Sequence, residues 1–525
     1  MEALRIFAQS EDIGSRTMAA TAALVAPAPP AVAAPAGANV GADAAAPAPE
    51  PAAPAPAPAP PTSAMSELSL ERVAPTTAPP AINAVAAPGA KKLRVMICGT
   101  HPYNSNGYSH VVTQLAKYLG AYDDIALTVY GFQLINKNAN ALVRHDIPSS
   151  VVLHDAMATE NPRRQGFGEK EIGGYLKEHP QDVIIIFNDM IVVSSILATL
   201  VNEFPGEERK KFRIVIYSDW VYPYQRKQFI DNMNNVVDGM IFFTPYWRDV
   251  AMKTGIRADM PTFVLPHGHD PMVHYPIPRR IARMYHALPQ DAFLILILNR
   301  NQPRKRLDHA MMALALVAQK HQELIKKNAA RPEKDRKTIR PIKMVIGTAM
   351  EGSWDLVEVL QFELRLLGLD PELAKEYLVA MPRPQMMSDR DINVLYSACD
   401  IGLNCAMGEG WGLCQSQHLG VGCPQVVVNT GGHREFLSPS WSMLVEPRWN
   451  FYLERHVDGV GGRTEVGTPG DFADSVWKYF TNPALVEKHG KAGRKNMLQN
   501  YRWKQIVDYF HDMVVQDLAA LPIRA

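Results

Sequence analysis

The chain has 525 residues, of which 47% are hydrophobic and 20% are charged, so it is long enough to form more than one hydrophobic core. A formal net charge of +1 excludes a general electrostatic attraction to nucleic acid. The first 90 residues hold three basic and seven acidic residues, and the rest of the chain therefore carries +5. A weakly basic body suits a small anionic ligand but does not require one.

The cysteines and the apolar runs exclude further classes of protein. The five cysteines are an odd number without a Cys-x-x-Cys pair, which argues against a disulfide framework and a zinc site. We expect free, buried thiols in a reducing compartment, and therefore a cytoplasmic protein. The apolar runs are too short to cross a bilayer and no secretory signal is evident, so a soluble or peripherally membrane-bound protein is expected. Nothing in the sequence indicates an oligomeric state.

Residues 20–90 consist mostly of alanine and proline, as in PAPEPAAPAPAPAPPTSA. Proline at this density interrupts helices and sheet ladders, and the segment has too few large apolar residues to form a core. We therefore predict that residues 1–90 form a disordered, partly polyproline arm that serves as a tether or docks a partner.

Apolar runs alternate with helical stretches from residue 91 onward. Residues 91–100 form a predicted strand, and the spacing of Val111, Val112, Leu115 and Leu119 then fits one face of a helix. Strands alternating with helices indicate a parallel, doubly wound sheet. Further strands are predicted at 125–132, 151–156, 182–189, 212–219 and 239–244.

A second series of the same kind follows the proline-rich segment 265–278, and the charge run at 326–341 is expected to be a solvated loop. The fold class is therefore α/β, with Rossmann-like domains at 91–275 and 276–500 and a final helix within 501–525. We expect the two domains to face a cleft, because ligands of open α/β sheets bind at the carboxyl ends of the strands. Strands of the second domain are predicted at 293–301, 342–350, 377–381, 400–406 and 424–430.

Three candidate site residues follow predicted strands of the first domain. Gly107 opens a helix, whose free N–H groups attract anions, although an ordinary tight turn explains it equally well. Asp189 and Asp219 each follow a strand, where they either contact a substrate or cap a helix.

Basic residues cluster after the first strand of the second domain, in NRNQPRKRLDHAM. Arg300 and Lys305 are five residues apart, and a guanidinium and an ammonium together suit a phosphate group. Arg304 and Arg306 are expected to face outward. A solvated basic surface is the alternative to a phosphate site.

Residues 408–424, GEGWGLCQSQHLGVGCP, surround an acidic residue with glycines. The glycines allow the loop to pass close to a ligand, and Glu409 can accept hydrogen bonds from sugar hydroxyls. Gln417 lies eight positions after Glu409, inside the following helix. Trp411 is expected to pack rather than to take part in chemistry, and His267 and His269 are expected to be turn residues.

Together these motifs resemble the family-four glycosyltransferases, which are retaining enzymes of the GT-B fold that use activated sugar donors. The family pattern of an acid, Gly, an aromatic residue and Gly matches residues 409–412, and Gln417 stands at the second acidic position. Arg300 and Lys305 match the family's phosphate pair, and PHGHD at 266–270 is similar to its interdomain turn. The resemblance extends over residues 93–515.

The resemblance implies that the C-terminal domain binds a nucleotide diphosphate sugar and that the N-terminal domain binds an unidentified acceptor. Arg300 and Lys305 would neutralise the leaving diphosphate, and Glu409 would hold the donor sugar. Asp189, offered where the family's usual histidine is not evident, is predicted as a further catalytic residue that contacts the sugar or positions the acceptor. The implied enzyme is a hexosyltransferase with no cofactor and no metal, whose last helix crosses back to the first domain. The implied substrate-binding residues are Gly107, Gly347, Gly410, Trp411, Gly412, Leu413 and Gln417.

The sequence departs from the family pattern at several positions. Gln417 replaces the second acid, Cys405 and Ala406 stand where a Pro-Ser pair is usual, and the usual histidine of the first domain is not evident. A non-catalytic GT-B scaffold is therefore an alternative, although the joint presence of Arg300, Lys305 and Glu409 favours an enzyme. A nicotinamide-dependent enzyme would need a Gly-x-Gly-x-x-Gly turn after the first strand, and the sequence lacks it.

Overall fold

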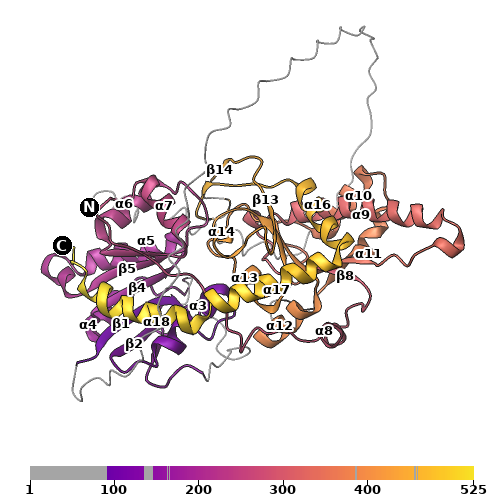
Figure 1. Ribbon diagram of the computed structural model, residues 1–525. Coiled ribbons are helices and arrows are strands. Elements are labelled where there is room, and N and C mark those ends of the chain that lie inside the picture. The colour runs from indigo at the N-terminus through magenta and orange to yellow at the C-terminus, as the bar shows by residue number, and fades with distance from the viewer. Residues whose placement is uncertain are drawn as a thin grey trace, which may run out of the picture. The chain divides into compact units, whose positions relative to one another are not determined.

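The computed structural model describes residues 91–134, 146–161, 164, 166–382, 384, 387–454, 457 and 459–524. The predicted arm at 1–90 lies outside these residues, and so does the N-terminal stretch in which no secretory signal was evident. The described chain contains two parallel sheets of seven and six strands (Figure 1). The prediction of two Rossmann-like sheets is therefore confirmed, whereas the exact domain boundaries stay predictions.

The first sheet has strand order β3-β2-β1-β4-β5-β6-β7, and every neighbouring pair is parallel. Its direction of winding reverses between β1 and β4, so the loops after these two strands open on opposite sides. The strands are β1 (Leu93–Thr100), β2 (Ile125–Phe132), β3 (Val152–Asp155), β4 (Val183–Asn188), β5 (Arg213–Ser218), β6 (Gly239–Phe242) and β7 (Thr262–Val264). The helices between them are α3 (Gly107–Leu119), α4 (Ile172–Glu178), α5 (Met190–Glu203), α6 (Lys227–Val236) and α7 (Pro245–Thr254).

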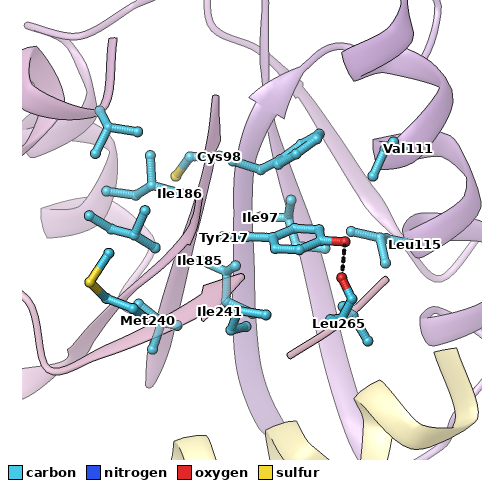
Figure 2. Close-up of a cluster of buried hydrophobic side chains, with 14 of the residues drawn as sticks. Ile97, Cys98, Val111, Leu115, Ile185, Ile186, Tyr217, Met240, Ile241 and Leu265 are labelled. Atoms are coloured by element: carbon cyan, nitrogen blue, oxygen red, sulfur yellow. Dashed lines mark hydrogen bonds between the residues drawn. The ribbon is translucent and has the colours of Figure 1, made fainter. Parts of the chain in front are cut away.

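Helices cover the first sheet, so its central strands are buried and read as continuous apolar runs. All six residues of β4, VIIIFN, are buried. Figure 2 shows this core, in which Tyr217 of β5 lies among Ile97, Ile185 and Leu115. Its hydroxyl donates a hydrogen bond to the carbonyl of Leu265 at 2.9 Å, which satisfies the only polar atom of the buried ring.

The second sheet has strand order β10-β9-β8-β11-β12-β13 and is also parallel throughout. Its winding reverses between β8 and β11, which are in register at Ile295 and Ile401. The strands are β8 (Phe293–Ile297), β9 (Ile342–Ile346), β10 (Leu378–Ala380), β11 (Ile401–Asn404), β12 (Gln425–Val428) and β13 (Met443–Val445). The helices are α8 (Arg279–Tyr285), α9 (Leu307–Ala329), α10 (Leu356–Leu366), α11 (Ala374–Tyr377), α12 (Asp389–Ala398), α13 (Leu413–Val421), α14 (His433–Phe436) and α16 (Pro469–Thr481).

Three features differ from the expected elements. The short edge strands β7 and β13 and the two-stranded hairpin β14 (Tyr452–Leu453) and β15 (Gly462–Arg463) were not expected, because three-residue runs carry little periodicity. The charge run at 326–341 is not wholly a loop, because α9 continues to Ala329. The segment 266–270, where His267 and His269 were expected to be turn residues, lies inside the protein, and both histidines are buried.

The chain ends with α17 (Pro483–Asn500), which packs on α13, and α18 (Trp503–Asp512), which packs on α3 (Figure 1). The apolar face of α18 is formed by Trp503, Ile506, Val507 and Phe510, all of which belong to the core of the first sheet. The end of the chain is thus part of the first hydrophobic core, although the sequence before it forms the second sheet.

We expect Phe510→Ala to lower the free energy of unfolding by about 3–5 kcal/mol, the usual cost of removing a fully buried phenyl ring. Phe510 is fully buried, whereas the adjacent Tyr509 is 54% exposed, so Tyr509→Ala is the matched control. Urea unfolding measures both variants. Equal midpoints for the two would show that α18 does not stabilise the first sheet.

Candidate active site

The predicted charged residues lie at the carboxyl ends of strands beside the reversal points of the two sheets. Lys305 follows β8, and Glu409 follows β11, the strand next to it. In the first sheet, Asp189 and Asp219 follow the adjacent strands β4 and β5. Parallel strands bring the loops that follow them to one edge, so residues far apart in the sequence meet there.

The centre of the site is an ion cluster around Glu409, whose side chain is 7% exposed. Lys305 Nζ donates to Glu409 Oε1 at 2.5 Å, and Asn404 Nδ2 donates to the same oxygen at 2.9 Å. Arg304 Nη1 lies 3.5 Å from Glu409 Oε2 and donates to the carbonyl of Gly408 at 3.3 Å. The expectation that Arg304 faces outward is therefore wrong: the 3-10 turn Pro303–Lys305 turns two consecutive cations toward one carboxylate.

The cluster perturbs the pKa values of its members. Burial raises the pKa of Glu409, but the charges of Lys305 and Arg304 outweigh burial and lower this pKa to about 2. Burial and the neighbouring Arg304 lower the pKa of Lys305 to about 8, against the opposing effect of Glu409. Two cations thus share one ionised carboxylate, an arrangement that favours a further anion.

The glycine-rich loop before α13 packs directly against the first domain. A Cβ atom at Gly410 would clash with Oδ1 of Asp219, and one at Gly408 would clash with the carbonyl of Val221. Trp247 Nε1 donates to the carbonyl of Gly410 at 2.8 Å. The glycines here allow close approach of two backbones rather than flexibility.

Gly412 has the left-handed backbone conformation, with φ of 97°, that starts α13. On the other side of the loop, Gly432 N–H donates to the carbonyl of Glu409 at 2.9 Å. A Cβ atom at Gly432 would lie 2.5 Å from the Cα of Trp411. The loop is therefore fixed on both sides, and this fixes the backbone that carries Glu409.

The first domain contributes Tyr108 and Asp219 to the site. Tyr108, next to Gly107 in the first turn of α3, donates from its hydroxyl to Asp219 Oδ2. Burial raises the pKa of Asp219; the hydrogen bond from Tyr108 and the charge of Arg304 oppose this, and the charges of Asp189 and Glu409 add to it. The charges of Asp219 in the first domain and of Glu409 and Arg304 in the second therefore influence one another.

Asp189 caps α5, because its Oδ1 accepts hydrogen bonds from the N–H groups of Ile191 at 3.0 Å and Val192 at 3.2 Å. The capping alternative is thus observed. The charge of Asp189 also raises the pKa values of Tyr108 and Asp219. Its assignment as a catalytic residue stays a prediction.

Gln417 lies inside the protein, between the two domains. Its Oε1 accepts a hydrogen bond from the hydroxyl of Tyr396 at 3.0 Å, and its Nε2 lies 3.3 Å from Nε2 of His110. Tyr396 belongs to α12 and His110 to α3, so the amide joins the second domain to the first. Contact of Gln417 with a ribose stays a prediction.

The remaining predicted residues differ in their surroundings. Arg300 is exposed and makes no hydrogen bond or ion pair through its side chain with the described residues. Gly347 is buried, its N–H donates to the carbonyl of Ile297 at 2.8 Å, and Leu298 fills the space where its side chain would be. Trp411 is 2% exposed and packs on Phe436, as expected for a packing residue. The substrate-binding roles of these residues stay predictions.

The starts of two helices come together at the site. A Cβ atom at Gly107, the first residue of α3, would lie 3.3 Å from the side chain of Leu413, the first residue of α13. Free N–H groups at helix starts bind anions, and both helices are long enough to contribute a dipole. The positive ends of the two helix dipoles thus add to the positive charge of Lys305 and Arg304.

Sequence reasoning missed the roles of Arg304 and Tyr108 in this arrangement. The signal for Arg304 was the density of basic residues after β8, and the signal for Tyr108 was its position beside Gly107. Neither signal identifies a partner, because Glu409 and Asp219 come from other parts of the chain.

The described residues contain neither a metal-binding cluster nor a membrane-spanning helix. No group of three or more His, Cys, Asp or Glu side chains there is placed to hold a metal ion. No helix in the same residues is long and apolar enough to span a membrane. All five cysteines are free, and Cys98, Cys399, Cys405 and Cys423 are buried.

No protein-family model matches the sequence, and no curated protein sequence is significantly similar to it. Solved structures, in contrast, match most of the chain. Sucrose-phosphate synthase from Thermosynechococcus elongatus is 15% identical with a TM-score of 0.59, over 82% of this chain and 100% of that protein. A glycosyltransferase from Rickettsia africae is 12% identical with a TM-score of 0.56, over 81% and 99%. HepE from Anabaena, in complex with UDP and glucose, is 14% identical with a TM-score of 0.55, over 81% and 99%.

At sequence identities this low, the structural similarity establishes the fold alone. The chain has the GT-B fold, with two doubly wound sheets and a charged cluster at the carboxyl ends of their central strands. The fold expected from the sequence resemblance is thereby confirmed.

Gly432→Ala tests the packing of the glycine loop. A Cβ atom there would meet the carbonyl of Gly410 and the backbone of Trp411, and such overpacking costs about 1–3 kcal/mol. Gly174 in α4 is the matched control, because its Cβ would meet nothing within 4 Å and alanine favours a helix by roughly 0.5–1 kcal/mol. We expect the urea midpoint to fall for the first variant and to hold or rise for the second. A midpoint unchanged in Gly432→Ala would contradict the tight packing.

Proposed function

We propose that the chain is a retaining glycosyltransferase that moves a sugar from a nucleotide diphosphate sugar to an acceptor not yet identified. The observation that carries the proposal is the buried cluster of Lys305, Arg304 and Glu409 at the reversal point of the second sheet. It has more cationic than anionic groups, and it adjoins the starts of α3 and α13. A nucleoside diphosphate carries the anionic charge that such a site favours.

The proposed reaction needs positioning and charge stabilisation rather than an enzyme nucleophile. The bond between the anomeric carbon and the diphosphate oxygen breaks while the acceptor oxygen bonds to the same face of the sugar. The leaving phosphate takes the proton of the acceptor hydroxyl. Lys305, Arg304 and Arg300 stabilise the charge that develops on the diphosphate, which is the dominant contribution in such catalysis.

Glu409 has two tasks in this proposal. Its carboxylate holds Lys305 in place before the donor binds, and its ionised oxygens accept hydrogen bonds from donor-sugar hydroxyls. Asp219 and Asp189 adjoin the cluster from the first domain, where the acceptor is proposed to bind. The similarity in fold to HepE, whose structures contain UDP, UDP and glucose, or UDP-glucose, supports a uridine diphosphate sugar as the first donor to test.

A non-catalytic GT-B scaffold is the second candidate. The observation in its favour is that Gln417 already forms contacts with Tyr396 and His110, so that its amide is not free for a ribose. The two candidates differ in one measurable property, since only the enzyme releases UDP from a UDP-sugar when an acceptor is present.

Arg300→Ala tests the proposed enzyme without disturbing the fold. Because Arg300 is exposed, we expect the free energy of unfolding to change by no more than about 0.5 kcal/mol. Loss of one charge-stabilising group should lower turnover by about 10²–10³-fold, as with the loss of one oxyanion-hole donor. Release of UDP from UDP-sugars, with a panel of hydroxyl acceptors, is the measurement.

Lys334→Ala is the matched control, since Lys334 is exposed and lies in the charged segment before β9. This variant should keep full turnover. Full turnover in Arg300→Ala would rule out the proposed role of Arg300, and absence of UDP release by the unmodified protein with every donor and acceptor would favour the scaffold.

The pH dependence of UDP binding tests the proposed role of Lys305. Its pKa of about 8 means that the ammonium is charged below pH 8 and becomes neutral as the pH rises above it, while Glu409 stays ionised. We expect the Kd for UDP to rise roughly fourfold between about pH 7 and about pH 8.5, with proton uptake on binding. Calorimetry in two buffers of different ionisation enthalpy measures both quantities. Affinity that is independent of pH over this range would contradict the role.

A further inference from the structure

A recess of about 510 Å³ lies at the edge of the second sheet opposite the candidate active site. Phe293 begins β8, Arg340 precedes β9 and Asp400 precedes β11, so the recess is at the amino ends of the central strands. The C-terminal end of α13 and the first turns of α17 complete its wall. None of these residues takes part in the proposed reaction.

The recess contains more cationic than anionic groups. Asp400, with a side chain 3% exposed, accepts hydrogen bonds from Arg279 at 2.9 Å, Arg283 at 2.9 Å and Arg340 at 3.0 Å. Three guanidiniums therefore share a single carboxylate. Arg279 and Arg340 keep side chains 45% and 34% exposed. Arg279 donates to Asp400 through Nη1, whereas Arg340 also donates through Nε and Nη2 to the carbonyls of Asp291 and Ala292, so that its Nη1 is the group available to a ligand.

Arg494 of α17 adds a third guanidinium to the lining of the recess, beside Arg279 and Arg340. It donates to the carbonyl of Gly420 at the end of α13, and it makes no ion pair with a carboxylate in the described residues. Burial accordingly lowers the pKa of Arg494, with no neighbouring acid to offset the effect. Lys491, also in the wall, is balanced by Glu487 at 2.5 Å.

Helix α17 lines the recess along one face, with Pro483, Glu487 and Arg494 in the wall. The recess therefore meets the side of this helix, and its attraction for an anion comes from the guanidinium groups. Guanidinium forks with free N–H groups match the oxygens of a phosphate group, with which they form two parallel hydrogen bonds.

We propose that this recess is a second anion site, which binds the phosphate group of a small phosphorylated molecule through Arg279, Arg340 and Arg494. A recess of about 510 Å³ has room for a small phosphomonoester, a polyphosphate or the phosphate headgroup of a lipid. The proposal does not depend on the proposed glycosyltransferase activity, because it rests on different residues at the opposite edge of the sheet.

The test uses the full chain and inorganic pyrophosphate as the probe, with binding measured by calorimetry. The double variant Arg279→Gln, Arg494→Gln removes two guanidiniums, and each charge-assisted hydrogen bond lost should weaken binding about tenfold or more. Lys495→Gln is the matched control, since Lys495 is exposed on α17 and does not line the recess. The single variant Arg279→Gln, at the more exposed residue, is used if the double variant does not fold.

The variant Arg300→Ala, in the candidate active site, shows which of the two sites binds pyrophosphate. Tenfold or greater weakening in the recess variants, with Arg300→Ala and Lys495→Gln retaining an equally tight site, would support the proposal. Binding that is lost in Arg300→Ala and retained in the recess variants would overturn it, as would an absence of pyrophosphate binding by the unmodified chain. Failure of UDP binding alone would affect the proposed function and not this site.

Cosedimentation with phosphatidylcholine vesicles that contain phosphatidate distinguishes the sources of the phosphate group. Retention on these vesicles that is lost in the recess variants would identify a lipid headgroup as the ligand. Pyrophosphate binding without vesicle retention would identify a soluble phosphorylated molecule. Vesicle retention that is equal in all variants, without pyrophosphate binding, would contradict the site.

Discussion

The pairing of Glu409 with Lys305 and Arg304 is the interaction on which the site depends. It joins the loops after β8 and β11, the two strands at which the winding of the second sheet reverses. A carboxylate buried here would be costly without cations, and two buried cations would be costly without the carboxylate. The cluster is thus stable only as a unit, and it leaves the site with cationic groups in excess over the carboxylate.

The position of this cluster relative to the first domain is set by backbone packing. The loop at 408–412 lies between Asp219 and Trp247 on one side and Gly431–Gly432 on the other, at distances that no larger side chain would permit. The glycines therefore give the loop one fixed path. A fixed loop suits a site whose proposed work is the positioning of charge, because preorganised groups need no rearrangement when charge develops.

Much of the fold could be predicted from the sequence, because fully buried parallel strands read as continuous apolar runs and the helices between them show helical spacing. The residue types of the site could be predicted as well, since Lys305 and Glu409 follow such strands. The direction of the Arg304 side chain could not be predicted. Arg304 lies in a 3-10 turn, and its side chain turns toward a loop that comes from another part of the chain. Asp219 was ambiguous because its partners, Tyr108 and Gly410, come from other elements.

The sequence by itself determined the order of the longer strands and helices and the presence of charged residues after particular strands. These features depend on local periodicity and on which residues tolerate a turn. Only the tertiary structure decided which charges meet, as with Arg304 and Glu409 at one edge of the second sheet and Arg494 among the arginines around Asp400 at the other. The reason is physical: an ion pair depends on separations of a few ångströms, which packing between distant segments creates and which no local pattern records.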